Sequence, residues 1–179
     1  MLFRSSKKTG ATTTGGGGGA TTAAYTLATP ATAGGYPLGQ DPNFLTASTA
    51  TAKQITDAVT AGGGGKVQGN PVSAAYRLGS NQVITFVGYQ GTFTPDKVQT
   101  ILATLANDSK TYPAGPNGGV LGCANTKATP SGAVCVWATG STLGVTEFYS
   151  ATGPETLNAA QAKGASDTVN LRAGVEKKK

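Results

Sequence analysis

The chain of 179 residues contains no histidine, and this absence removes several kinds of active site at once. A Ser-His-Asp triad and a Cys-His dyad both need an imidazole as the general base. A zinc site needs about four nitrogen, sulfur or oxygen ligands, which two cysteines without histidine are not expected to supply. We therefore predict that the protein is not an enzyme and holds no catalytic residue, no metal and no cofactor.

Long apolar runs are also missing. No stretch approaches the ~18 consecutive apolar residues that a membrane helix needs. The first residues, MLFRSSKK, carry the positive charge typical of a signal peptide, but no apolar segment follows them. No export signal is therefore visible, and we expect contact with a membrane only through an anchor that is missing from this chain.

Charged residues make up only 12% of the chain, and the formal net charge of +6 is unevenly placed. Arg4, Lys7 and Lys8 lie near the start, and the segment 177–179 is Lys-Lys-Lys. Between these two ends, basic and acidic residues nearly balance, so no basic face is expected to follow a phosphate backbone. Nucleic acid is therefore not an expected partner. We expect the terminal charges to be solvated, with contact to an acidic membrane surface as the alternative.

The segment 1–22 has a composition that cannot build a core. It passes from a basic patch into Thr and Ala and then into five consecutive glycines, which lose much backbone entropy on ordering and bury little. We interpret it as a flexible linker. The remainder, 23–179, is long enough for a single domain with a hydrophobic core and too short for two.

The spacing of apolar residues predicts a mixture of helices and strands in this domain. Helical spacing occurs at 46–65, at 94–108 and after Pro154, whereas a short alternating strand begins at Tyr25. The fold class expected is α+β: a mostly antiparallel sheet packed on one face by two or three helices. The further strands are predicted at Val72–Leu78, Val83–Tyr89, Val120–Ala124, Ala133–Thr139 and Leu143–Tyr149.

The helix at 94–108 has well-defined ends and one apolar stripe, which we expect to pack against the strands that contain Cys123 and Trp137. Trp137 and Cys135 are two residues apart in a strand, so they point to the same face of the sheet. The opposite face, with Val136 and Ala138, is expected to lie under the C-terminal helix. The stripe consists of Val98, Ile101, Leu102 and Leu105, and the C-terminal helix would contribute Leu171 and Val175.

Cys123 and Cys135 are separated by twelve positions and are the only cysteines in the chain. A redox site would be expected to have the spacing C-x-x-C, which is absent. The two residues lie in apolar strand segments joined by a loop, an arrangement that can bring their Cα atoms within bridging distance. A structural disulfide is the favoured interpretation, and two reduced cysteines in the core are the alternative. A disulfide favours an oxidising, extracytoplasmic location.

Two glycine-containing stretches resemble known site motifs but depart from them. GGGGKV at 62–67 suggests a phosphate-binding loop, yet Thr60 and Val67 occupy the positions where that motif needs Gly and Ser or Thr. GSTLG at 140–144 has the outline of a nucleophile elbow, but its central residue is Thr142, in a strand–turn–strand setting. We expect a helix exit for the first stretch and a hairpin turn for the second.

Several segments occur in an order that resembles one group of proteins. They are YTLATPATAGGYPLG, ITFVGYQGTFTPDKV, GGVLGC, AVCVWATGSTLGVTEFYS and VNLRAGVE, spread over 25–176. The chain resembles the extracytoplasmic domains of actinobacterial, Streptomyces-type, membrane-anchored proteins of unknown function. The resemblance implies that Cys123 and Cys135 form a disulfide outside the membrane, and it brings no ligand or activity with it.

Two functional classes remain. The first is a non-catalytic cell-envelope domain, secreted or on the cell surface, that binds an envelope protein or a small ligand. The second is a structural subunit that assembles with copies of itself, which the low charge and the richness in Thr, Ala and Gly favour.

Overall fold

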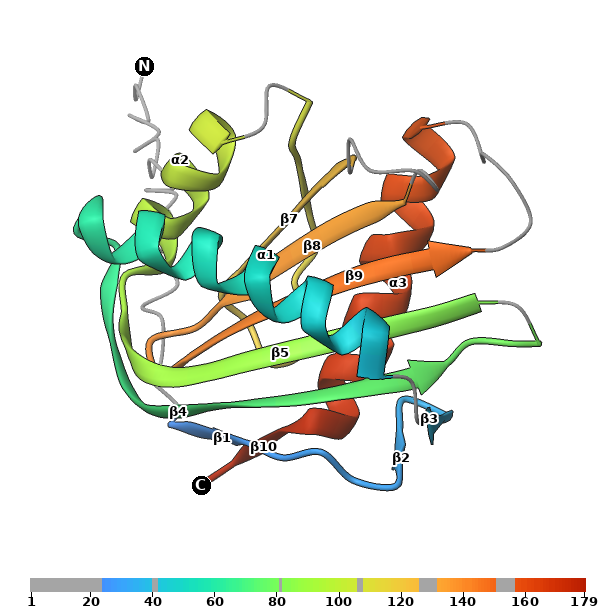
Figure 1. Cartoon of the computed structure of the whole chain (residues 1–179). Helices are drawn as coiled ribbons and strands as arrows, with labels where there is room; N and C mark the ends of the chain where they lie inside the picture. Colours follow the sequence, from blue (N-terminus) through green and yellow to red (C-terminus); the bar gives the residue numbers. More distant parts are fainter. Residues whose placement is uncertain (1–23, 40–41, 81, 106–107, 126–131, 151–156) are drawn as a thin grey trace, which may run out of the picture.

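The computed structural model describes residues 24–39, 42–80, 82–105, 108–125, 132–150 and 157–179. The segment 1–22, expected to be a linker, lies outside these residues. The described part is an α+β fold of three helices, an eight-stranded antiparallel sheet and a separate two-stranded ribbon (Figure 1). The expected fold class is therefore confirmed.

The main sheet has the strand order β2-β3-β4-β5-β9-β8-β7-β6, and all its neighbours pair antiparallel. The long hairpin β4–β5 forms one half, and the meander β7–β8–β9 forms the other. The strands of this sheet are β2 (Thr32–Ala33), β3 (Tyr36–Gly39), β4 (Gly65–Arg77), β5 (Gln82–Phe93), β6 (Lys110–Tyr112), β7 (Val120–Asn125), β8 (Ala133–Ala138) and β9 (Thr142–Ser150). The separate ribbon pairs β1 (Tyr25–Leu27) with β10 (Glu176–Lys178).

Helices cover both faces of this sheet. The general expectation of helices on one face is therefore wrong, whereas the expectation that the second face of the strand with Val136 is also covered by a helix is confirmed. In Figure 1, α1 (Pro42–Ala61) and α2 (Pro95–Leu105) lie in front of the sheet and α3 (Leu157–Val175) lies behind it. The reason is that the central strands are apolar on both sides and therefore need cover on both. One core contains residues of α1 and α2, and a second core on the opposite face contains residues of α3.

Strand β8 shows how this differs from the expected packing. Cys135 and Trp137 share one face and Val136 and Ala138 the other, as their alternation predicts. However, the helices that cover the two faces of β8 are the reverse of those expected. The face with Cys135 and Trp137 packs against α3, and the face with Val136 packs against α1 and α2. Alternation determines which residues share a face, but not which helix covers it.

The prediction of the apolar stripe of α2 is confirmed except at its last residue. Val98 and Leu102 are buried in the core under α1 and α2, and Ile101 packs partly buried against it. Leu105 is 51% exposed, so its assignment to the core is wrong. It is the last residue of α2, where no neighbouring element in the described part of the chain covers it.

Helix α1 starts four residues before the predicted position and ends at Ala61 with a Schellman motif. The amide of Gly64 donates to the carbonyl of Val59, and that of Gly63 donates to Thr60. Gly63 has φ +69°, a left-handed conformation that favours glycine. The residue that caps α1 is therefore Gly63.

A second hairpin, β2–β3, was not predicted. Its loop is Gly34-Gly35, and both residues have positive φ, as a two-residue type I′ turn requires. A Cβ atom at Gly34 would lie 2.3 Å from the carbonyl oxygen of Asn170. The turn can therefore pack against α3 only because it has no side chain there.

We predict that Leu102→Ala lowers the free energy of unfolding by about 2–5 kcal/mol, because it leaves a cavity between α2 and the sheet. The matched variant Leu105→Ala should change it by less than about 0.5 kcal/mol, since that side chain is exposed. Urea denaturation of both variants measures the difference. Equal losses would contradict the packing of α2 described above.

Candidate functional site

The stretch 62–67 is a helix exit, as expected. The amides of Gly62, Gly63 and Gly64 all donate to carbonyls of the last turns of α1. Because these N–H groups are already used, they cannot cradle a phosphate group. The side chain of Lys66 points into solvent from the start of β4.

The stretch 140–144 is a tight turn between β8 and β9, again as expected. The amide of Thr139 donates to the carbonyl of Thr142, and the hydroxyl of Thr139 accepts from the amides of Ser141 and Thr142. The Thr142 hydroxyl is buried and donates to a carboxylate oxygen of Glu176. It is therefore a structural group and not an exposed nucleophile.

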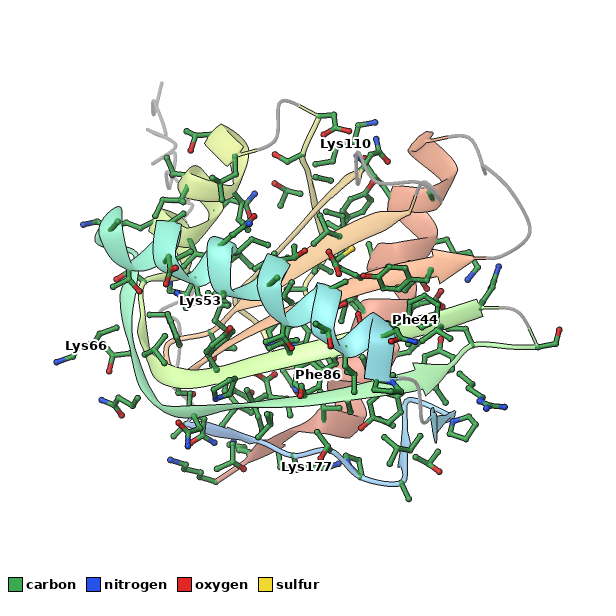
Figure 2. The ribbon with its side chains drawn as sticks, viewed as in Figure 1. Phe44, Lys53, Lys66, Phe86, Lys110 and Lys177 are labelled. Atoms are coloured by element: carbon green, nitrogen blue, oxygen red, sulfur yellow. A yellow bond between two sulfur atoms is a disulfide. The ribbon has the colours of Figure 1, made fainter. Side chains whose placement is uncertain are left out.

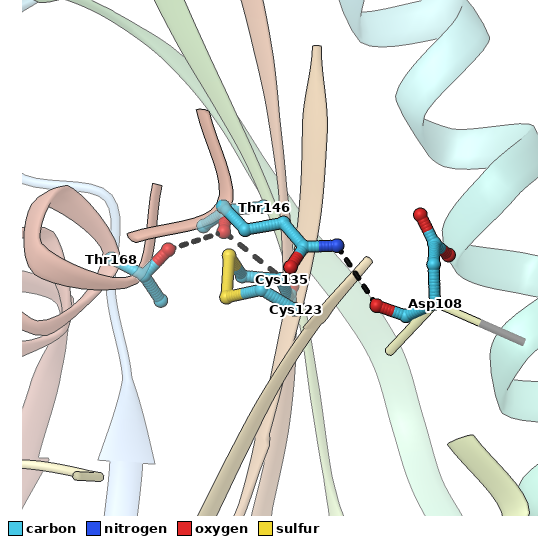
Figure 3. Close-up of a disulfide and its surroundings, with 6 residues drawn as sticks. Asp108, Cys123, Cys135, Thr146 and Thr168 are labelled. Carbon is cyan, nitrogen blue, oxygen red and sulfur yellow. Dashed lines mark hydrogen bonds between the residues drawn. A yellow bond between two sulfur atoms is a disulfide. The ribbon is translucent and has the colours of Figure 1, made fainter. Parts of the chain in front are cut away.

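Cys123 and Cys135 form a disulfide (Figure 3). They lie directly opposite each other in β7 and β8, with Cα atoms 4.1 Å apart, and both are buried. The favoured interpretation of the two cysteines is thus confirmed. The bridge joins the two strands next to the loop that connects them.

Hydroxyl and amide groups attach α3 to the sheet around this disulfide. Thr146 of β9 and Thr168 of α3 share a buried hydrogen bond of 2.7 Å between their hydroxyls, and Thr146 also donates to the carbonyl of Cys135 (Figure 3). The side-chain amide of Gln161 donates to the carbonyl of Asp108 at 3.0 Å. These hydrogen bonds fix the position of α3 along the strands.

A buried carboxylate, that of Glu176, collects donors from four parts of the chain. Arg172 of α3 donates from Nε to Oε2 at 2.6 Å, and the two side chains are 2% and 0% exposed. Asn117 donates to Oε2 at 2.9 Å, and the indole Nε1 of Trp137 donates to Oε1 at 3.3 Å. With the Thr142 hydroxyl, four side chains bind one carboxylate. We name this group the Glu176 network.

Arg172 extends the network to the loop 113–119. Its Nη1 donates to the carbonyl of Ala114 at 2.7 Å, and its guanidinium carbon lies 5.7 Å from the centroid of Trp137. Its Nη2 is buried and has no hydrogen-bond partner within the described residues. A buried ion pair with this many internal partners fixes the end of α3 against β8 and β9, and it has no face open to a substrate.

A second buried carboxylate, Glu147 of β9, lies under α1. Its Oε2 accepts hydrogen bonds of 2.6 Å from both Ser48 of α1 and Tyr149 of β9. Thr85 of β5 contacts the Ser48 hydroxyl and donates to the Glu147 carbonyl at 3.3 Å. The ring of Phe44, labelled on α1 in Figure 2, lies 4.7 Å from that of Tyr149. We name this group the Glu147 cluster.

The Glu147 cluster contains the atoms that a hydroxyl nucleophile and its base would need, since Ser48 donates directly to a carboxylate. Ser48 is only 2% exposed, however, and its hydroxyl points into the interface between α1 and the sheet. The arrangement therefore acts as a polar attachment for the first half of α1. Burial, followed by the hydrogen bond to Glu147, raises the pKa of Tyr149 to about 12.

Sequence reasoning missed both carboxylate groups. Glu147 and Glu176 are isolated acidic residues, and their partners lie far away in the chain. Ser48 and Glu147 are 99 residues apart, and Trp137 and Glu176 are 39 residues apart. The one available signal was a single charged residue in a predicted core strand, as at Glu147 of β9, because a buried carboxylate must find internal donors.

Neither a metal centre nor a membrane helix is found in the part of the chain that the structure describes. No three His, Cys, Asp or Glu side chains gather there in a way that could hold a metal ion. No helix among the same residues is long and apolar enough to cross a bilayer. No protein-family model, no curated protein and no solved structure matches this chain.

We predict that Glu176→Gln lowers the free energy of unfolding by roughly 3–5 kcal/mol, because it leaves Arg172 buried without a counter-charge. The matched variant Lys53→Gln breaks an exposed ion pair with Asp57 and should leave the melting temperature nearly unchanged. Thermal unfolding of both variants tests this. If the Glu176 variant has the same melting temperature as the wild type, the Glu176 network does not hold α3 on the sheet.

We also predict that stability falls as pH rises from about 10 to about 12. The folded protein keeps Tyr149 protonated up to a pKa of about 12, whereas the unfolded chain ionises it near 10.0. Its contribution to stability is therefore complete below pH 10 and is lost progressively as the pH rises to about 12. Tyr149→Phe should make this decline less steep. Denaturant midpoints across the range measure the slope, and an unchanged slope would contradict the burial of this phenol.

Proposed function

We propose that this chain is a non-catalytic, extracytoplasmic domain of the cell envelope that works by binding a protein partner or a small ligand. The observation that carries the proposal is the buried disulfide between Cys123 and Cys135. Disulfides persist in oxidising compartments and are rare in the cytosol. The resemblance to extracytoplasmic domains of actinobacterial membrane-anchored proteins agrees with this location.

The use of the buried polar groups supports binding rather than catalysis. Glu147 and Glu176, the two buried carboxylates among the described residues, are both occupied by internal donors. Ser48 and Thr142, the hydroxyls beside them, are buried with them. Carboxylates and hydroxyls held in this way stabilise the fold. We infer that the function is binding, through a surface of the folded domain.

Both edges of the main sheet favour the binding domain over the self-assembling subunit. At one edge, β3 pairs only with Ala75 and Tyr76 of β4. The earlier part of β4 therefore pairs with β5 on one side and has no strand on its other side in the described sheet. That part contains Pro71, which lacks a backbone donor, and a register shift between Gln68 and Val72. The other edge, β6, has only three residues. Short strands, proline and bulges oppose association of strands between molecules.

The proposal is tested by the state of the thiols in protein taken from its natural location. We expect no labelled cysteine when the unreduced protein is denatured and exposed to a thiol reagent, and two after reduction. The double variant Cys123→Ser, Cys135→Ser controls for labelling at other groups. Two labelled cysteines without reduction would refute the extracytoplasmic location.

Light scattering on the same sample separates the two functional classes. A binding domain should give a mass near that of one chain, 17.7 kDa, over a wide range of concentration. A mass that grows with concentration would favour the self-assembling subunit instead. This measurement does not depend on the thiol result.

A further inference from the structure

Asn117 is the one asparagine of the chain that is followed by glycine, and it lies in the loop 113–119. In an Asn-Gly pair the backbone nitrogen of the glycine can attack the side-chain carbonyl carbon of the asparagine, because no side chain on the glycine hinders the approach. Gly118 also has φ +67°, a left-handed conformation that glycine adopts without strain. The residue that lets the loop turn here is therefore the residue that makes Asn117 susceptible to deamidation.

Both reacting groups are held by hydrogen bonds in the folded protein. The amide of Gly118 donates to the carbonyl of Gly115 at 3.1 Å and closes a β-turn. The side-chain nitrogen of Asn117 donates to Oε2 of Glu176 at 2.9 Å. Attack on the Asn117 side chain requires that these two bonds break first. Gly115, Pro116 and Gly118 are exposed, so this turn can open locally while the rest of the domain stays folded.

We propose that Asn117 is a deamidation site, and that its conversion releases the turn 115–118 from β10. The nitrogen of Gly118 forms a bond to Cγ of Asn117, and the bond from Cγ to the side-chain nitrogen breaks. That nitrogen takes the proton of the Gly118 amide and leaves as ammonia. Water then hydrolyses the five-membered succinimide at one of its two carbonyls, which gives aspartate or isoaspartate at position 117. The reaction needs no oxidant or reductant.

The product cannot restore the bond that held the turn closed. A carboxylate has no hydrogen to donate at neutral pH, and at position 117 it would face the buried carboxylate of Glu176. Two carboxylates that share a buried site repel each other. Isoaspartate also adds a carbon atom to the backbone, which changes the length of the β-turn. An opening that is reversible before the reaction therefore becomes permanent after it.

The rest of the Glu176 network survives this change. The other donors to Glu176 come from Trp137, Thr142 and Arg172, none of which lies in the loop. Ala114 still accepts a hydrogen bond from Arg172, so the first part of the loop stays attached. The modification therefore uncovers one side of the network without unfolding the domain. Such a change concerns the lifetime of the domain and goes beyond the proposed function, since it holds whatever partner is bound.

The first test is peptide mapping by mass spectrometry of the full chain after incubation in mildly alkaline buffer, once folded and once unfolded in guanidinium chloride. We expect Asn117 to be converted in both samples, more slowly in the folded one, and to yield aspartate and isoaspartate together. Asn70 is the internal control and should stay intact, because Pro71 follows it and has no backbone N–H. Equal rates in the two samples, or no conversion in the folded one, would overturn the proposal.

The second test is the variant Asn117→Asp, matched by Asn70→Asp, which adds the same charge at an exposed position. Asn117→Asp should lower the melting temperature by roughly 3–12 °C, because a hydrogen bond to a charged group is lost. Asn70→Asp should leave it nearly unchanged. Acrylamide should quench the fluorescence of Trp137, the only tryptophan, more strongly in the Asn117 variant, since Trp137 and Asn117 bind the same carboxylate.

The pH dependence separates charge repulsion from the loss of the amide alone. Repulsion from Glu176 raises the pKa of a carboxyl group at position 117, so the loss of stability is complete at neutral pH and shrinks as the pH falls toward about 4. Arg172 is the other charged group beside Glu176 and is present in every variant. Asn117→Ala should not show this recovery.

Equal melting temperatures for the two aspartate variants, or quenching equal to that of the wild type, would overturn the proposal. So would a wholly unfolded Asn117→Asp variant, as judged by circular dichroism, because only one turn should be released. The peptide map is measured on the wild type and does not depend on any variant.

Discussion

The arrangement of the whole fold depends on one constraint: the central strands are apolar on both faces. In β5, Ile84 and Phe86 point to one face, and Val87 and Tyr89 point to the other. A sheet of this kind cannot leave either face in water without exposing a large apolar area. The helices therefore divide between the two faces, and the short elements near the termini fill the remaining area. Leu27 of β1 belongs to the core under α3.

Apolar contacts are not directional, so they do not by themselves fix where a helix lies along the sheet. The hydrogen bonds of two buried carboxylates fix that position. Glu147 receives the hydroxyl of Ser48 and fixes α1 on one face, and Glu176 receives Arg172 and fixes the end of α3 on the other. In each case a buried charge must keep its donors, because an unpaired one would cost several kcal/mol. The two helices can therefore not slide along the sheet without losing these bonds. The disulfide adds a covalent tie between β7 and β8 close to the second network.

The sequence predicted what local patterns determine. No end of β7, β8 or β9 differs from its predicted position by more than one residue. The reason is that the alternation of apolar residues and the turn residues are local signals. The disulfide could also be predicted from the sequence, because a loop of fixed length joins the two adjacent strands that contain the cysteines. The helix that covers each face could not be predicted, because the connection from β5 to α2 allows either side. The pairing of β1 with β10 joins residues about 150 positions apart, beyond the range of any periodicity.

The same distance explains why the polar groups were missed. Ser48, Thr85 and Glu147 come from three separate elements, and none carries a motif of its own. Leu105 shows the opposite error. Its helical spacing matched the stripe of α2, but spacing cannot tell that this side chain is exposed to water rather than covered by the sheet.

The ribbon of β1 and β10 also determines how the domain responds to a pulling force. Ala24 and Lys179 lie at the same end of an antiparallel pair, so a force that separates them acts on one hydrogen bond at a time. Strands loaded in this way unzip at low force, whereas strands pulled along their length resist with all their bonds together. Between these two residues the molecule is therefore mechanically weak, and the first event under tension is the release of the ribbon, with the disulfide-bridged sheet still intact behind it.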